Sequence, residues 1–231
     1  MPDKDRFLHR LVHDIRGPVR ALADLPHWIS EDMEARDDAL PPAVVTMLRL
    51  VAENAGRLDE LLARLAVFAA AGQGPMTEVE PIDPGTVIAA MPVPKGVDLK
   101  LELQACTVHV SVEDVTLLVR ELIDNARKFH PDGAPTVTLR SQAQPGGGWA
   151  LSICDDGPGF PQNMAHTAFQ PLTRAACGHR SPGPGLGLAI VGALVARYGG
   201  AVRVQPSPGA HVVIRVPVRA PGGAIGKQSG P

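Results

Sequence analysis

The chain lacks a cysteine framework, an excess of charge of either sign and any long uncharged apolar run. Cys106, Cys154 and Cys177 are odd in number and include no CxxC pair, so we expect free thiols in a reducing compartment. The 22 Lys and Arg residues are balanced by 24 Asp and Glu residues, which leaves a net charge of −2. A protein that binds nucleic acid needs a basic face to neutralise phosphates, so this class is excluded.

The apolar runs are too short to cross a membrane. The longest lie at residues 63–71 and 186–195, and Arg64 interrupts the first, whereas a spanning helix needs about 20 apolar residues. The N-terminus also shows no signal-peptide pattern. We therefore expect a cytoplasmic protein without membrane insertion.

The sequence does contain enough apolar material for two modest domains. Of its 231 residues, 45% are hydrophobic and 20% are charged, a balance typical of globular proteins. A breaker cluster, Ala71-Gly-Gln-Gly-Pro75, separates a helical region from a mixed one. We predict an α+β protein with a helical hairpin at residues 1–72, an α/β sandwich at 76–219 and a disordered tail at 220–231.

Both helices of the N-terminal region carry apolar residues at alternating steps of four and three, the seam by which helices pack in bundles. A hairpin alone buries only one side of each seam, so we expect two copies to form a homodimeric four-helix bundle. The seam residues are Leu8, Val12, Ile15, Val19 and Leu22 in the first helix, and Val44, Leu48, Val51, Ala55, Leu58, Leu62, Leu65 and Ala69 in the second.

His13 falls one position after Val12, off the seam and on the solvent side of the first helix. A histidine satisfied in the core would lie on the seam itself, so a buried structural role is the weaker interpretation. Asp14 follows directly, and an exposed histidine beside an acid can accept a phosphoryl group.

After residue 76 the pattern alternates between strand and helix. Helices are predicted at 115–129 and 185–198, with a loop or lid at 161–184. Strands are predicted at 97–103, 107–112, 136–141, 149–155, 201–204 and 211–218.

The first of three motifs in this domain is a polar stripe on the helix at 115–129. Glu121, Asn125 and Lys128 are spaced by four and three residues and so share one face. An amide oxygen can coordinate Mg²⁺ and a lysine can neutralise phosphate, although a solvated helix face explains the same spacing. His130 comes two residues after Lys128, and on this sequence proximity alone we expect it to neighbour a bound nucleotide.

The second motif, Asp155-Asp-Gly157-Pro-Gly159, ends a predicted strand. Its glycines let the backbone approach a flat ring, and a carboxylate can accept a hydrogen bond from an exocyclic amine such as that of adenine. A plain turn is the alternative.

The third motif is the glycine cluster Gly183-Pro-Gly185-Leu186-Gly187, which opens a predicted helix. The free N–H groups of a helix start can cradle phosphate. Such a cluster taken alone is weak evidence for a nucleotide site.

In this order and context the three motifs resemble the N, G1 and G2 boxes of the ATP-binding domain of sensor histidine kinases, members of the GHKL ATPase superfamily. Phe169 in the predicted lid resembles the F box of that domain. The stretch from His13 to Pro18 resembles the H box of the dimerisation and phosphotransfer domain. The resemblance covers nearly the whole chain, from about Asp5 to Arg219.

The resemblance implies a two-component kinase that uses ATP and Mg²⁺ to phosphorylate His13 and then passes the phosphoryl group to an aspartate of a response-regulator receiver domain. Asp14 would accept the ring proton or hold the tautomer. Asn125 would hold the nucleotide through Mg²⁺, Lys128 would contact its phosphates and Asp155 would accept a hydrogen bond from the adenine amine. The pocket would be shaped by Gly157, Gly159 and Phe169. The closing lid would include Gly183, Gly185, Leu186 and Gly187. Further lid candidates are Arg174 and Arg180.

The sequence departs from the family pattern at three points. Gly17 stands four residues after His13, where related kinases that also dephosphorylate their regulator usually carry Thr or Asn, so we expect little phosphatase activity. The pair Gly17-Pro18 weakens the helix, and a local bend is expected there. Leu172 stands where a second Phe of the F box is common.

No sensor segment or transmitting coiled coil precedes Asp5, so we expect the signal to come from a separate sensor protein or from the ATP-binding domain itself. Two other functions stay open. A phosphotransfer adaptor would keep His13 and let the nucleotide site decay. A GHKL switch, such as a serine kinase that controls a partner, would need no phospho-acceptor hairpin.

Overall fold

The computed structural model describes residues 2–36, 39–73, 79–161, 164, 167–173 and 184–218, with side chains from Arg10 onward. The chain divides into two compact units, residues 1–73 and 74–231. Each unit has its own apolar core. None of the described helices is both long enough and apolar enough to cross a membrane.

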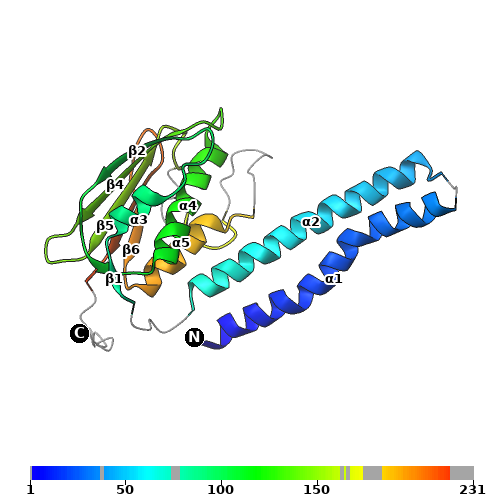
Figure 1. Cartoon of the computed structure of the whole chain (residues 1–231), viewed down its shortest axis with the longest axis horizontal. Coiled ribbons are helices and arrows are strands. Elements are labelled where there is room, and N and C mark those ends of the chain that lie inside the picture. Colours follow the sequence, from blue (N-terminus) through cyan, green and yellow to red (C-terminus); the bar gives the residue numbers. More distant parts are fainter. Residues whose placement is uncertain are drawn as a thin grey trace. The chain divides into compact units, whose positions relative to one another are not determined.

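The first unit is a hairpin of two long helices, α1 (Pro2–Ala35) and α2 (Pro42–Ala71), which lie side by side in Figure 1. The helix α1 continues through Pro18 and Pro26, so the Gly17-Pro18 pair does not end it. Each proline lacks the N–H that would bond to the carbonyl four residues earlier, and the turns on either side maintain the helix across that gap.

Only half of the predicted seam is buried within the hairpin. The buried row occupies every seventh residue, namely Val12 and Val19 of α1 with Ala55, Leu62 and Ala69 of α2. The hairpin therefore closes through one row of the seam and leaves a second apolar row uncovered. That exposed row consists of Ile15 and Leu22 of α1 with Val51 and Leu58 of α2.

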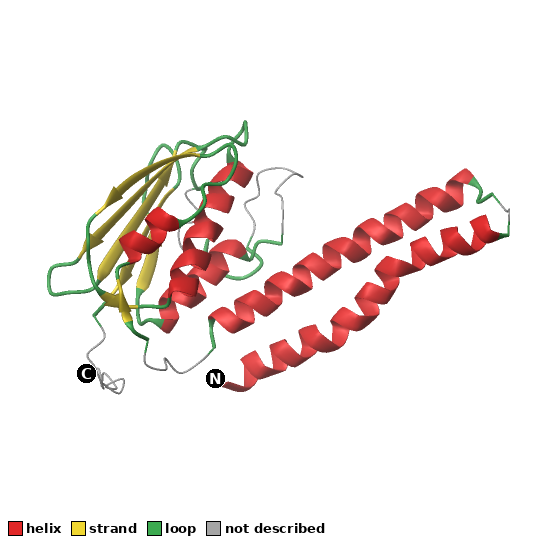
Figure 2. Ribbon diagram, in the orientation of Figure 1, coloured by secondary structure: helices red, strands yellow, loops and turns green. Residues whose placement is uncertain are grey.

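The second unit is an α/β sandwich of one sheet and one helical layer. Three helices, α3 (Pro84–Ala90), α4 (Val112–Phe129) and α5 (Gly187–Arg197), cover one face of the sheet (Figure 2). The predicted order, a helical hairpin followed by an α/β sandwich, is confirmed. The sheet order is β2 (Asp98–Leu103), β4 (Thr136–Ala143), β5 (Trp149–Asp155), β7 (His211–Val216) and β6 (Ala201–Val204), with β1 (Pro81–Ile82) and β3 (Val108–His109) forming a small separate pair.

The sheet is mixed. The edge strand β2 runs parallel to β4, and all other neighbours are antiparallel. Alternate residues of the central strands point toward the helices and form the core, because successive side chains of a strand lie on opposite faces. These buried residues include Val137, Leu139, Leu151, Ile153, Val212 and Ile214.

Several predicted boundaries are wrong, and three of the differences have a local reason. The strand expected at 107–112 is reduced to β3 because Ser111 starts α4 by accepting a hydrogen bond from the Asp114 N–H at 3.1 Å. The helix α5 starts at Gly187 rather than at 185 because Gly185 has a φ of +71°, which a right-handed helix does not allow. The last strand ends before Pro217, which has no N–H for a ladder.

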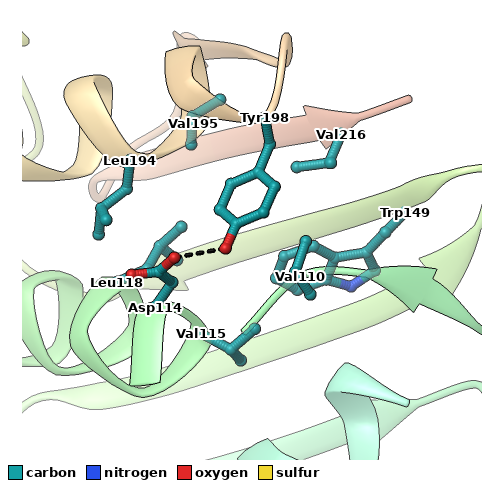
Figure 3. Close-up of a pocket in the computed structure, with 9 residues that line it drawn as sticks. All are labelled: Val110, Asp114, Val115, Leu118, Trp149, Leu194, Val195, Tyr198 and Val216. Carbon is teal, nitrogen blue, oxygen red and sulfur yellow. Dashed lines mark hydrogen bonds between the residues drawn. The ribbon is translucent and has the colours of Figure 1, made fainter. Parts of the chain in front are cut away.

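A polar clamp joins the start of α4 to the end of α5 (Figure 3). The Asp114 carboxylate accepts hydrogen bonds from the Tyr198 hydroxyl and the Arg197 guanidinium. The Ser111 N–H donates to the same hydroxyl at 3.0 Å, and Trp149 lines the small apolar pocket beside it. Since the first turn of α4 meets the last turn of α5, the two helices are antiparallel. The N-terminal end of α5 therefore lies alongside the C-terminal half of α4.

Candidate functional site

His13 is an exposed side chain of α1. Its side chain is 85% exposed and that of Asp14 is 77% exposed, with Nδ1 lying 3.3 Å from the carboxylate Oδ1. A carboxylate beside Nδ1 favours the tautomer that carries its proton there, which leaves a free lone pair on Nε2. The pair thus presents a nucleophilic nitrogen to solvent.

The face of α1 that carries His13 is polar. Arg16 and Gly17 share it, at steps of three and four. The Arg16 Nε lies 3.5 Å from Oδ1 of Asp59 on α2, a partly exposed pair of the kind that contributes roughly 0–1 kcal/mol. Ile15 of the exposed apolar row is about 200° around the helix from His13, because each residue turns the helix by about 100°.

The polar stripe of α4 runs from the domain interior to solvent. Glu121 is buried, Asn125 is half-buried and Lys128 is exposed. Helical spacing keeps Leu122 and Ile123 of the same turns in the core. A merely solvated face would leave Glu121 in water, so its burial argues against that alternative.

The Asp155 carboxylate at the end of β5 is held by backbone groups from two segments. Its Oδ1 accepts hydrogen bonds from the Gly157 N–H at 2.9 Å and the Ala210 N–H at 3.0 Å, and its own N–H donates to the Ala210 carbonyl at 3.0 Å. Among the described residues, Oδ2 has no hydrogen-bond partner. A carboxylate fixed by one oxygen and open at the other is suited to accept a hydrogen bond from an amine.

Gly209 is a site residue that sequence reasoning missed. It lies in the turn between β6 and β7, and a Cβ on it would overlap the Asp155 carbonyl oxygen and stand 2.8 Å from the Asp155 carbonyl carbon. Gly159 has a φ of +74° and packs back on the same turn, where its Cβ would lie 3.1 Å from the Gly209 oxygen. The only sequence signal was the turn-forming stretch around Gly209, which indicates a hairpin and not what that hairpin contacts.

Asp156 is held from the side of α4. Its Oδ1 accepts a hydrogen bond from the Thr136 N–H at 2.9 Å and lies 3.5 Å from Nε2 of His130, the residue that ends α4. Partial burial acts to raise the pKa of Asp156, but the hydrogen bonds to Thr136 and the nearby His130 outweigh it and leave the pKa below its ordinary value. These contacts bring the end of α4 to the end of β5.

The glycine cluster starts α5 beside Phe169. Leu186 is buried, Gly187 is the first helical residue, and no described side chain caps this end, so its N–H groups are available to an anion. Gly192 packs against Phe169, since a Cβ there would lie 3.2 Å from the phenylalanine Cβ. The structure therefore brings the α4, β5 and α5 motifs to one end of the domain. Three predicted residues lie outside the described part of the chain: Arg174, Arg180 and Gly183.

Residues 110–220 match the histidine kinase-, DNA gyrase B- and HSP90-like ATPase family. This defines the second unit as an ATPase-type domain of that class. The chain as a whole belongs to the sensor histidine kinase family. The solved structure of a mycobacterial sensor histidine kinase, MprB, is 31% identical, with a TM-score of 0.52, and the match covers 61% of this chain and 99% of that one.

Longer relatives extend the match over the hairpin. The signal transduction histidine-protein kinase/phosphatase MprB of Mycobacterium bovis is 25% identical over 236 residues, which cover 94% of this chain and 46% of that protein. The Mycobacterium leprae protein of the same name is 27% identical over 219 residues. Full-length ShkA shares the fold, with a TM-score of 0.61 and 22% identity over 94% of this chain. The chain spans less than half the length of the curated relatives named here.

Proposed function

We propose that this chain is the catalytic core of a two-component histidine kinase, which phosphorylates His13 from ATP and passes the phosphoryl group to an aspartate of a response-regulator receiver domain. The observation that carries the proposal is the exposed His13 with Asp14 Oδ1 3.3 Å from its Nδ1, in the same chain as an ATPase-type domain. A pure phosphotransfer adaptor would need no adenine carboxylate, whereas two backbone N–H groups hold Asp155 in place.

The chemistry consists of two phosphoryl transfers. The Nε2 lone pair of His13 attacks the γ-phosphorus, the bond to the β,γ-bridging oxygen breaks, and ADP leaves with that oxygen. Asp14 takes or shares the Nδ1 proton as positive charge develops on the ring. The carboxylate of the regulator's aspartate then attacks the same phosphorus, and the P–N bond breaks to return neutral histidine. Catalysis of this kind depends on positioning and charge neutralisation.

The nucleotide roles proposed here are those that the resemblance to the N, G1, F and G2 boxes implies, and the hydrogen bonds that hold Asp155 support them. Asp155 Oδ2 would accept a hydrogen bond from the adenine amine, in a pocket shaped by Gly157, Gly159 and Phe169. Lys128 would contact the phosphates. Gly183, Gly185, Leu186 and Gly187 would close over the triphosphate. The structure of full-length ShkA, which shares the fold, was solved in complex with AMPPNP, which supports nucleotide binding by this chain.

Magnesium fits the site as a companion of the nucleotide. No group of three or more His, Cys, Asp or Glu side chains in the described ranges forms a metal cage by itself. The half-buried Asn125 carboxamide supplies a hard oxygen, and Mg²⁺ is commonly held by one or two protein oxygens with phosphates and water. The ion would neutralise charge on the transferring phosphates.

We infer a homodimer through the exposed apolar row of the hairpin. Ile15, Leu22, Val51 and Leu58 are between 38% and 47% exposed, and a second copy would bury them in a four-helix bundle. His13 lies on the far side of α1 from Ile15, so such pairing would leave it accessible.

Incubation of the purified chain with γ-labelled ATP and Mg²⁺ tests the proposal. We expect label on the protein that is lost in acid and retained in alkali, as for a phosphohistidine, and that moves to an added receiver domain. Nucleotide binding without label would indicate a GHKL switch, and absence of both binding and label would indicate an adaptor. Either result would overturn the kinase proposal.

Gly17→Thr is expected to increase hydrolysis of the phosphorylated regulator. The MprB relatives are named kinase/phosphatase, yet Gly17 offers no side chain to position water. A Cβ on Gly17 meets no heavy atom within 4 Å, so threonine fits. We expect the half-life of a phosphorylated receiver domain mixed with the Gly17→Thr protein to fall by roughly tenfold relative to wild type, because water is held in line for attack.

Gly17→Ala is the matched control for this substitution. Alanine fills the same open space and favours the helix by about 1 kcal/mol, but it cannot hold water. Equal hydrolysis by the alanine and threonine variants would show that helix stiffening, and not a water-positioning side chain, limits the phosphatase reaction.

A further inference from the structure

Two segments converge on one oxygen of Asp156. The Thr136 N–H at the start of β4 donates to Oδ1 at 2.9 Å, and His130 Nε2 at the end of α4 lies 3.5 Å from the same atom. His130 is only two residues beyond Lys128, and Asp156 directly follows Asp155. The contact therefore joins the helix that carries the phosphate-binding candidates to the residue beside the adenine carboxylate.

The tautomer of His130 is indicated by the contact of its other nitrogen. The Asp132 N–H donates to His130 Nδ1 at 3.3 Å, so Nδ1 is an acceptor and the ring proton lies on Nε2. This tautomer places a proton on Nε2, which lies 3.5 Å from Asp156 Oδ1, within the range of a charge-pair contact. The His130 side chain is 13% exposed, compared with 52% for Asp156, so the donor is held in the domain while the acceptor sits at its surface.

We propose that His130 and Asp156 form a positioning bridge, through which the end of α4 fixes the adenine carboxylate Asp155 and so sets the selectivity for an amino-substituted purine. The inference rests on the proposed nucleotide site. Asp155 is anchored from the turn between β6 and β7 by Ala210, and Asp156 anchors the same strand end from the opposite chain segment. The two anchors hold residues 155 and 156 from opposite neighbouring strands, β7 and β4.

The bridge has a measurable consequence for base recognition. Adenine presents an exocyclic amine that can donate to Asp155 Oδ2, whereas hypoxanthine presents an oxygen that repels the carboxylate. A fixed Asp155 favours ADP over IDP, and a carboxylate that can rotate away loses part of that preference. A purely structural role for His130 would lower stability without changing the ratio of the two affinities.

The test is calorimetric titration of the whole chain with ADP and with IDP, in the presence of Mg²⁺. We expect wild type to prefer ADP by tenfold or more, and His130→Ala to reduce this preference by roughly threefold to tenfold, about the net effect of one ordinary polar contact. His130→Gln, whose amide can donate from a similar position, should retain most of the preference. Asp156→Asn should behave like His130→Ala, and Asp155→Asn should abolish the preference.

Glu102→Gln is the matched control. Glu102 is an exposed carboxylate of the same sheet that pairs with Arg140 through two hydrogen bonds, away from the motifs, so its loss should leave the ratio unchanged. An ADP to IDP ratio in His130→Ala equal to that of wild type, at a lower melting temperature, would overturn the bridge and leave the nucleotide site intact. Wild type that binds neither nucleotide would instead overturn the nucleotide site, and the bridge with it.

Discussion

Replacing His13 with alanine is expected to abolish labelling of the protein from γ-labelled ATP while leaving ADP affinity unchanged. The substitution removes the attacking nitrogen, and the side chain is 85% exposed, so neither the hairpin core nor the ATPase-type domain loses a buried contact. Label should fall to background, whereas Asp14→Asn should slow the reaction by roughly 10²-fold, the usual contribution of a positioned base. Scintillation counting of acid-labile label against time measures both effects.

His27 provides a matched control on the same helix. It is also exposed, at 72%, and its Nε2 lies 3.2 Å from Oε1 of Glu31, so it too is a histidine beside an acid. We expect His27→Ala to be labelled at the wild-type rate, because phosphoryl transfer requires a particular histidine and not any exposed one. Loss of label in His27→Ala, or label that persists in His13→Ala, would identify a different acceptor. Asn125→Ala should lose label together with the Mg²⁺-dependent part of nucleotide affinity.

Gly209→Ala is expected to weaken ADP binding by roughly tenfold to hundredfold, although Gly209 belongs to none of the predicted motifs. Its Cβ would overlap the Asp155 carbonyl oxygen, so the turn must move away and take with it the Ala210 N–H that holds Asp155 Oδ1. Overpacking of this kind costs about 1–3 kcal/mol, and each 1.4 kcal/mol corresponds to about a tenfold change in affinity. Titration with ADP, with circular dichroism to show that the domain stays folded, measures the effect.

Gly199→Ala separates steric overlap from the general cost of replacing a glycine. Gly199 has a φ of +66°, which disfavours alanine, but a Cβ there meets no heavy atom within 4 Å. We expect Gly199→Ala to lower the free energy of unfolding by about 1 kcal/mol through backbone strain and to keep wild-type ADP affinity. If the two alanine variants bound ADP equally well, the turn between β6 and β7 would have no role in holding Asp155.

The features that the sequence by itself determined are those carried by local spacing. The helical periodicity places Val12 and Ile15 on a seam and His13 off it, and the structure finds His13 exposed. The glycines and carboxylates of the second domain resemble the boxes of histidine kinases because each box is a short continuous stretch. Each stretch can be read from the sequence because its residues act with neighbours three or four positions away. The order of the stretches along the chain then gives the family and the order of the two units.

The choice between the two rows of the helical seam required tertiary structure. Val19 and Leu22 are equivalent in an alternating pattern of four and three, yet Val19 is 3% exposed and Leu22 is 47% exposed. The difference arises because α2 covers only one side of the α1 seam. The apolar pattern by itself does not indicate which side is covered. The start of α4 is a different case, because the Asp114 N–H donates to Ser111 Oγ only three residues away, a local helix-start signal that the apolar pattern alone does not include.

The contacts that surround the proposed nucleotide site also depend on the tertiary fold. Ala210 reaches Asp155 across 55 residues of chain, and Thr136 reaches Asp156 across 20. The first contact exists because β7 pairs with β5 in a register that brings the turn at Gly209 beside the end of β5. The second exists because β4 pairs with β5 so that Val137 lies opposite Asp155. Periodicity and motif spacing predict the secondary structure and the candidate chemistry of a single segment. Which two distant segments meet depends on the order and register of the sheet, which are set by packing of the whole domain.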